Sequence, residues 1–165
     1  MHQLVELQHL TRSEFLRGLE GVSDEAARRR VEPMNCISWM VAHLAHQERA
    51  FFVAGARGER AEPRFRAFGN ASDSSQPPLE EAMALWREAS EDADALLHAA
   101  TEESMREVVI APDPRGNSAE LGTRLVRNIF HYWVHIGEIS AIRQVLGHPS
   151  PPEFVTLHGW TYGGS

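Results

Sequence analysis

The feature that most constrains the fold is a long run with helical spacing, from about Ser118 to Leu146, that carries His131 and His135. A step of four residues in an α-helix leaves two side chains about 40° apart, one turn above the other. Both histidines fall on the apolar stripe of this helix, whose other members are Asn128, Glu138, Ile139, Ile142 and Leu146. A buried imidazole needs a hydrogen-bond partner or a metal, so the pair is interpreted either as two metal ligands or as two hydrogen-bonded core histidines.

The composition is that of a globular protein with one full-sized core. The chain has 165 residues, of which 42% are hydrophobic and 24% are charged, and this length suits one domain. The net charge of −7 and the scattered arginines argue against nucleic acid as a partner. The single Cys36 excludes an internal disulfide and a cysteine-based metal cluster. No apolar run approaches the roughly 20 residues that cross a bilayer, and the N-terminal residues do not resemble a signal peptide. We therefore expect a cytoplasmic protein with no membrane partner.

Helical spacing of apolar residues predicts three further helices, at about residues 2–20, 35–56 and 79–100. Asn35 is the expected N-cap of the second helix. The acidic face of the third helix is expected to be solvated; its residues are Glu80, Glu81, Glu88, Glu91, Asp92 and Asp94. Four helices with apolar stripes predict an all-α fold, an antiparallel four-helix bundle.

The segments between the helices are predicted to be irregular. Residues 57–78 form a long connection without clear periodicity, which is either a functional loop or a spacer. Residues 101–117 are interpreted as a short extended piece followed by a turn from Pro112 to Gly116. We expect residues 1–150 to form the bundle and residues 151–165 to form a non-helical tail packed on or near it, through the aromatic residues Phe154, Trp160 and Tyr162.

The second helix offers two further histidines, His43 and His46. On the helical wheel His43 lies at the edge of the apolar arc, whereas His46 lies about 80° further out, so His43 is the better candidate for an inward position. Helical bundles build metal sites from inward side chains on facing helices. Three neutral imidazoles at His43, His131 and His135 suit Zn, Ni, Fe or Cu, and three protein ligands leave a position open for water or substrate.

Residues next to these histidines are candidates for supporting roles. Glu138 lies three residues after His135 on the same face, and it is interpreted as a proton acceptor, as a hydrogen-bond partner of a ligand imidazole, or as an ordinary helix carboxylate. Asn128 is a further candidate partner of the ligands. Gly137 costs a helix interior about 1 kcal/mol relative to alanine, which a close helix approach would explain. The aromatic residues Trp39, Tyr132 and Trp133 either line a pocket or belong to the core.

Two segments carry a resemblance to a known family. They are Asn35-Cys-Ile-Ser-Trp-Met-Val-Ala-His43-Leu-Ala-His-Gln-Glu48 and His131-Tyr-Trp-Val-His135-Ile-Gly-Glu138-Ile. Together, about 90 residues apart and on the expected helices, they resemble the DinB/YfiT-like superfamily, and the match covers nearly the whole chain. The resemblance implies a three-histidine metal site at His43, His131 and His135, and a homodimer.

The same resemblance implies two classes of activity. One is a thiol S-transferase or isomerase that uses mycothiol, bacillithiol or glutathione, and the other is a metal-dependent hydrolase; fold analogy alone does not choose between them. Our first hypothesis is therefore a metal-dependent enzyme that acts on a small molecule, with Zn or Ni as the expected metal and a low-molecular-weight thiol as a second cofactor. The alternative is a non-catalytic metal-binding or stress-response bundle protein.

Overall fold

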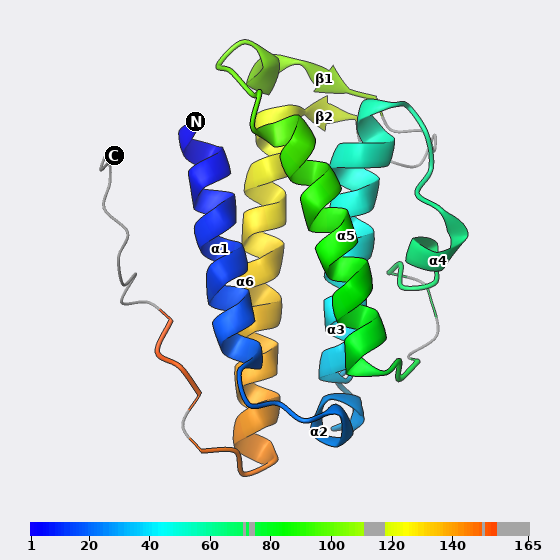
Figure 1. Cartoon of the computed structure of the whole chain (residues 1–165), viewed down its shortest axis with the longest axis vertical. Coiled ribbons are helices and arrows are strands. Elements are labelled where there is room, and N and C mark those ends of the chain that lie inside the picture. Colours follow the sequence, from blue (N-terminus) through cyan, green and yellow to red (C-terminus); the bar gives the residue numbers. More distant parts are fainter. Residues whose placement is uncertain (71, 73–74, 111–117, 150, 155–165) are drawn as a thin grey trace.

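The computed structural model describes residues 1–70, 72, 75–110, 118–149 and 151–154. Within these residues four long helices lie side by side: α1 (Gln3–Leu19), α3 (Ile37–Glu48), α5 (Leu79–Leu97) and α6 (Leu121–Val145) (Figure 1). A π-helix, η1 (Arg49–Ala54), continues α3, and α2 (Asp24–Arg28) and α4 (Pro63–Arg66) are short. The 3₁₀ turn η2 (Ser104–Arg106) precedes β1 (Val108–Val109), which pairs antiparallel with β2 (Ala119–Glu120). The predicted all-α class is confirmed.

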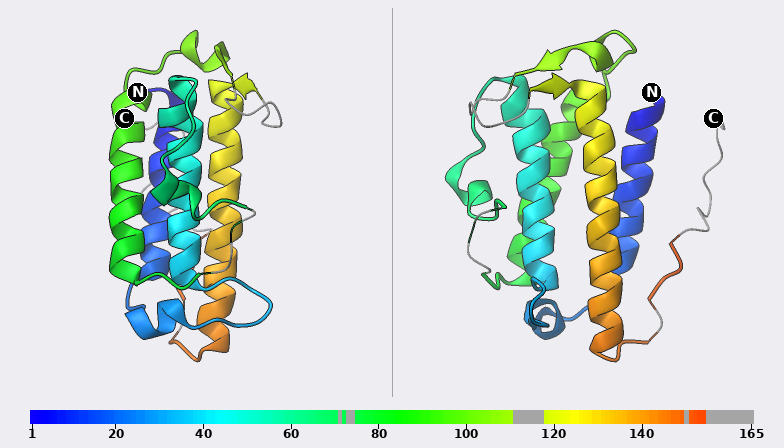
Figure 2. Two further views of the ribbon diagram at one scale, coloured as in Figure 1. Left: turned by 90° about the vertical axis from the view of Figure 1, so that its right-hand side faces the viewer. Right: turned by 180° about the vertical axis from the view of Figure 1, so that it is seen from behind.

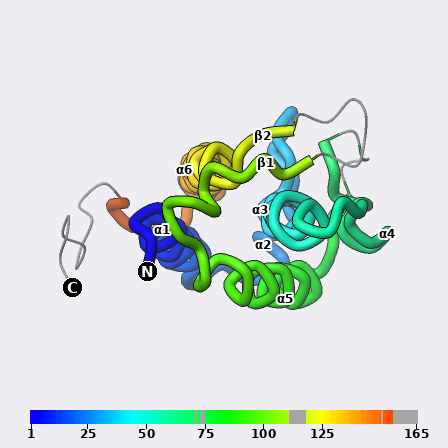
Figure 3. The backbone as a smooth tube through the Cα atoms, turned by 90° about the horizontal axis from the view of Figure 1, so that it is seen from above, coloured from blue at the N-terminus to red at the C-terminus, as the bar shows by residue number. Residues whose placement is uncertain are grey.

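The four long helices run in two directions. In Figure 1, α1 and α6 run downwards, whereas α3 and α5 run upwards. The long connection after η1 includes α4, which lies on the outer side of α3 (Figure 3). The next helix, α5, begins at the end of the bundle where α3 also begins (Figure 1). There the backbone N–H of Leu79 donates to the carboxylate of Asp24, the first residue of α2. The closest packing joins α1 to α6 and α3 to α5, so each of these two pairs is parallel and the pairs are antiparallel to each other.

The observed element ends differ from the predicted ones in detail. The N-cap of α3 is Cys36 and not Asn35, and its side chain makes no capping hydrogen bond. The connection predicted at 57–78 contains α4, which starts at Pro63 as the ring geometry of proline favours. The segment predicted to be extended forms η2 and β1, while the turn predicted from Pro112 to Gly116 lies outside the described residues.

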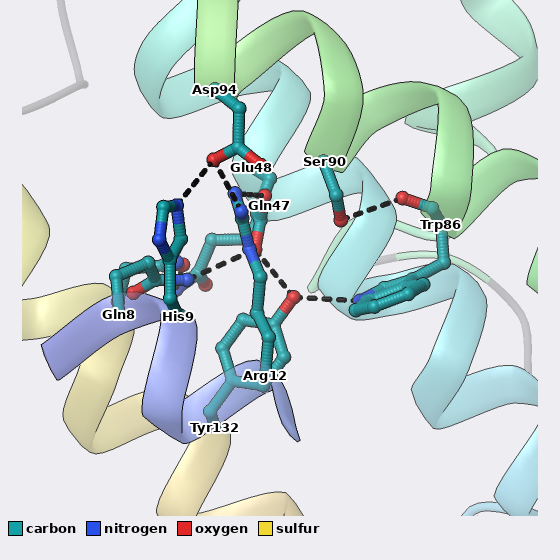
Figure 4. Close-up of polar contacts among 10 residues, drawn as sticks. Gln8, His9, Arg12, Gln47, Glu48, Trp86, Ser90, Asp94 and Tyr132 are labelled. Carbon is teal, nitrogen blue, oxygen red and sulfur yellow. Dashed lines mark hydrogen bonds and ion pairs between the residues drawn. The ribbon is translucent and has the colours of Figure 1, made fainter. Parts of the chain in front are cut away.

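A buried polar network joins the four long helices (Figure 4). The guanidinium of Arg12 on α1 donates from Nε to the Glu48 carboxylate of α3, at 2.9 Å, and from Nη1 to the Asp94 carboxylate of α5, at 2.6 Å. The hydroxyl of Tyr132 on α6 also donates to Glu48, and it accepts from the indole N–H of Trp86 at 2.7 Å. Asp94 therefore does not belong to a solvated face. Asp92 remains exposed, as predicted, and pairs with Arg49 of η1.

The tail contacts the bundle where the structure describes it. Phe154 packs against the core near Gly18 of α1, and Arg17 donates to the carbonyl oxygen of Glu153 at 3.0 Å. Trp160 and Tyr162 lie outside the described residues. The division into residues 1–150 and a tail stays a prediction. Among the described residues, no helix has both the length and the apolar character needed to span a membrane.

Candidate metal centre

Three histidines from two helices meet at one point inside the bundle. The Nε2 atom of His131 lies 2.9 Å from Nε2 of His135 and 3.3 Å from Nε2 of His43. All three ligand atoms lie within 4.8 Å of one another. His43 and His135 are buried, and His131 is partly exposed. The view from behind shows α6 between α3 and α1, so α6 can bring its two histidines to the one on α3 (Figure 2).

The second ring nitrogen of two of these histidines has a fixed partner. The Nδ1–H of His43 donates to the backbone carbonyl oxygen of Phe68 at 2.7 Å, and that of His135 donates to the Glu138 carboxylate at 2.6 Å. These oxygens can only accept, so both imidazoles carry their proton on Nδ1. The ring of His43 is also stacked on Trp39, with centroids 4.7 Å apart. The partners therefore aim two Nε2 lone pairs at the same point.

His131 alone cannot donate a hydrogen bond to the Nε2 lone pairs of both His43 and His135. A neutral imidazole has one N–H, and its Nε2 proton could be donated to only one of the two neighbours. If Nε2 carries a lone pair instead, three acceptors face one another, and the buried Nδ1 of His131 has no hydrogen-bond partner among the described residues. An electropositive group between the rings would resolve this arrangement.

The distance between the Nε2 atoms of His43 and His131 fits a divalent metal. For tetrahedral zinc with Zn–N bonds of about 2.0–2.1 Å, two ligand nitrogens lie about 3.3–3.4 Å apart. The separation between His43 and His131 has this value, and that between His131 and His135 is slightly shorter. Three nitrogen ligands match Zn or Ni better than Mg or Ca.

The surroundings of His43 and His131 keep their imidazoles in the form that can bind a metal. Burial lowers the pKa of His43, and burial together with the neighbouring His135 and His43 lowers the pKa of His131 to about 3. The rings of His43 and His131 are therefore neutral at pH 7, which is the form that binds a metal. The hydrogen bond from His135 lowers the pKa of Glu138, so this carboxylate stays ionised beside the ring.

The structure shows where the other residues that the sequence singled out for the site lie. His46 lies outside the cluster, with its ring beside Gly69, and burial lowers its pKa to about 4. Asn128 is buried and accepts a hydrogen bond from Gln47 at 3.0 Å, away from the ligand nitrogens. A Cβ built on Gly137 would meet nothing within 4 Å among the described residues, so no helix of this chain approaches there.

Sequence reasoning missed two features of the site. The Phe68 carbonyl comes from the connection predicted to be irregular, and no residue pattern marks a backbone acceptor. A cavity of about 320 Å³ lies beside His131, and its other lining residues are Gln47, Phe51, Asn70, Arg127 and Phe130. A larger cavity, between η1, α5 and β1, is not lined by any of the three histidines.

Comparison with known proteins places the chain in a family. The family model described as mycothiol-S-transferase matches residues 3–147, which include all four long helices and the three histidines. Among curated proteins no relative matches the chain. The family match confirms the DinB-like resemblance that the two histidine segments carry. Because the match spans most of the sequence, the chain belongs to the mycothiol-S-transferase family.

Proposed function

We propose that this protein is a metal-dependent thiol S-transferase that acts on a small molecule. The observation that carries the proposal is the convergence of three Nε2 atoms, two of them held by partners on the far side of the ring. The family supports thiol transfer as the reaction class. His43, His131 and His135 would hold a divalent transition metal, with Zn or Ni as the best match.

The chain's own residues supply position and charge for this chemistry. A metal bound to the histidines would favour the thiolate form of a thiol at its open position. In the transfer, the thiol loses its proton to solvent and its sulfur bonds to an electrophilic carbon, while the leaving group departs with the electron pair of the broken bond. Glu138 holds His135 in the required tautomer, and the stacked Trp39 restricts the ring of His43. Glu138 is thus proposed as a positioning residue and not as the proton acceptor.

Metal analysis tests the proposal. The purified wild-type protein should retain about one equivalent of metal after dialysis, and the double variant His131→Ala/His135→Ala should retain almost none. His46→Ala is the matched control, because His46 is partly buried on the same helix as His43 but lies outside the cluster. Equal metal contents in the wild type and the double variant would overturn the proposal.

Activity assays separate the two reaction classes. Turnover of an electrophile that requires a low-molecular-weight thiol is expected, and chelation should abolish it. Turnover with water alone would instead indicate a hydrolase. A protein that binds metal but turns over neither thiol conjugates nor esters would support the non-catalytic alternative.

A homodimer is the second part of the proposal. One exposed face of α6 carries no charged residue over four turns; its members are Phe130, Val134, Gly137, Ala141 and Val145. Phe130, Val134 and Val145 are each more than half exposed. Gly137 lies near the middle of this face, and a second α6 crossing there would give the glycine a packing role that the described part of this chain does not provide. A cytoplasmic location remains our prediction from the sequence.

A further inference from the structure

The cavity beside His131 combines a cation, two amides and two aromatic rings. Its lining among the described residues is Gln47, Phe51, Asn70, Arg127, Phe130 and His131, and none of these carries a carboxylate. Its volume of about 320 Å³ is near the lower limit of small-molecule sites, which suits a compact ligand and not a macromolecule. Because His131 forms one wall, a molecule in this cavity lies next to the histidine cluster.

Arg127 is the charged group of this cavity. It is exposed and precedes His131 by one helical turn. In the described part of the chain its guanidinium makes no hydrogen bond or ion pair, and its Cζ atom lies 5.7 Å from the centroid of the Phe51 ring. Other exposed arginines here do find carboxylates, as Arg64 does with Glu88. The charge of Arg127 is therefore available to a ligand.

A second arginine, Arg124, lies near Arg127. Arg124 lies close enough for the two guanidinium charges to repel, and burial together with this repulsion lowers the pKa of Arg124. Arg124 also contacts the ring of Phe51, at 5.5 Å, and donates to the Val109 carbonyl oxygen at 3.0 Å. In a chain with a net charge of −7, the described lining of the cavity beside the histidine cluster thus carries one cationic side chain, that of Arg127.

We propose that Arg127 binds the carboxylate of a reactant whose apolar or aromatic body packs on Phe51 and Phe130. The planar guanidinium can make two parallel hydrogen bonds to a carboxylate, and the amides of Gln47 and Asn70 can bind further polar groups. The carboxylate belongs either to the electrophile or to the thiol. This inference rests on the proposed function for the identity of the reactants, but not for the binding itself.

Binding to the full-length, chelator-treated protein tests this inference without any metal or turnover. One probe series is phenylacetate, 3-phenylpropanoate and 4-phenylbutanoate, each compared with its neutral amide; a second pair is 3-mercaptopropanoate and its amide. We expect at least one acid to bind about tenfold more tightly than its amide. The preference should disappear in Arg127→Gln and persist in part in Arg127→Lys. Preference among the phenyl acids assigns the carboxylate to the electrophile, and preference for the mercapto acid assigns it to the thiol.

Arg87→Gln is the matched control, since Arg87 is an exposed arginine of α5 far from this lining. It should leave every acid-to-amide ratio unchanged. The inference is overturned if no acid is preferred, or if a preference survives in Arg127→Gln. An acid preference that appears only after metal is restored, and that Arg127→Gln leaves intact, would also overturn it, because the carboxylate would then bind the metal. Failure of the proposed thiol transfer would not alter any of these measurements.

Discussion

At the scale of single residues, the metal centre depends on which ring nitrogen carries the proton. The Phe68 carbonyl and the Glu138 carboxylate settle this for His43 and His135, because each accepts a hydrogen bond from Nδ1. His131 has no such partner among the described residues. The three proposed ligands are therefore not equivalent, and the partner of His135 is the one that a side-chain substitution can change.

Glu138→Gln should weaken metal binding by about 10- to 100-fold, since the amide still accepts a hydrogen bond but no longer supplies the negative charge that makes His135 a stronger ligand. Competition against a chromophoric chelator measures the change. Glu81→Gln, at an exposed position of α5, should have no effect. Unchanged metal affinity with a large fall in kcat would instead make Glu138 a proton acceptor.

At the scale of elements, the side chains on different faces of α6 have different roles. His131 and His135 face α3, Tyr132 lies in the buried network, and the uncharged face that begins at Phe130 is exposed. The 3.6-residue period sorts these side chains around a single helix. The exposed face is the part of α6 for which the described chain supplies no packing partner.

Val134→Glu should convert the proposed homodimer into a monomer, because it places a charge at the centre of an apolar contact between two copies. Sedimentation velocity measures the change in mass. Leu16→Glu is the control, since Leu16 is an exposed leucine of α1, 39% exposed, away from this face. A wild-type protein that is monomeric at micromolar concentration would contradict the dimer.

At the scale of the whole molecule, one ion pair links elements that are distant in sequence. Arg12 and Glu48 form this pair, and their side chains are 6% and 0% exposed. Gln8 and Tyr132 also donate to Glu48, Arg12 also donates to Asp94, and Trp86 donates to Tyr132. Buried charges are stable only when each has its partners. The network therefore makes the correct packing of all four long helices depend on the same carboxylate.

Glu48→Ala should lower the free energy of unfolding by about 3–5 kcal/mol, because it leaves the Arg12 guanidinium buried with an incomplete set of partners. Urea denaturation of the chelator-treated protein measures this without a contribution from bound metal. Glu88→Ala, which removes the partner of Arg64 in an exposed pair, should cost at most about 1 kcal/mol. Similar losses in the two variants would show that the buried network contributes little.

Much of the fold could be predicted because the buried face of a helix is visible in the spacing of apolar residues along the sequence. Apolar spacing located the four long helices to within a few residues, and the same spacing ranked His43 above His46 as the inward histidine of α3. The prediction that the acidic face of α5 is solvated was wrong for Asp94. The sequence does not distinguish a carboxylate that is paired with a buried arginine from one that is hydrated. The predicted close approach at Gly137 is likewise not made within the described chain.

The sequence by itself determined the helices, their inward faces and the two histidines that share α6, because a residue's place on a helix follows from its neighbours a few positions away. Only the tertiary structure decided that α3 and α5 run parallel, that Arg12 meets Glu48, and that the Phe68 carbonyl holds His43. The contacts of His43 with Phe68, of Arg12 with Glu48 and of His43 with His131 join residues that are 25 to 88 positions apart. They depend on the path of the connections and on how side chains from different helices fit together. Helical periodicity predicts neither of these.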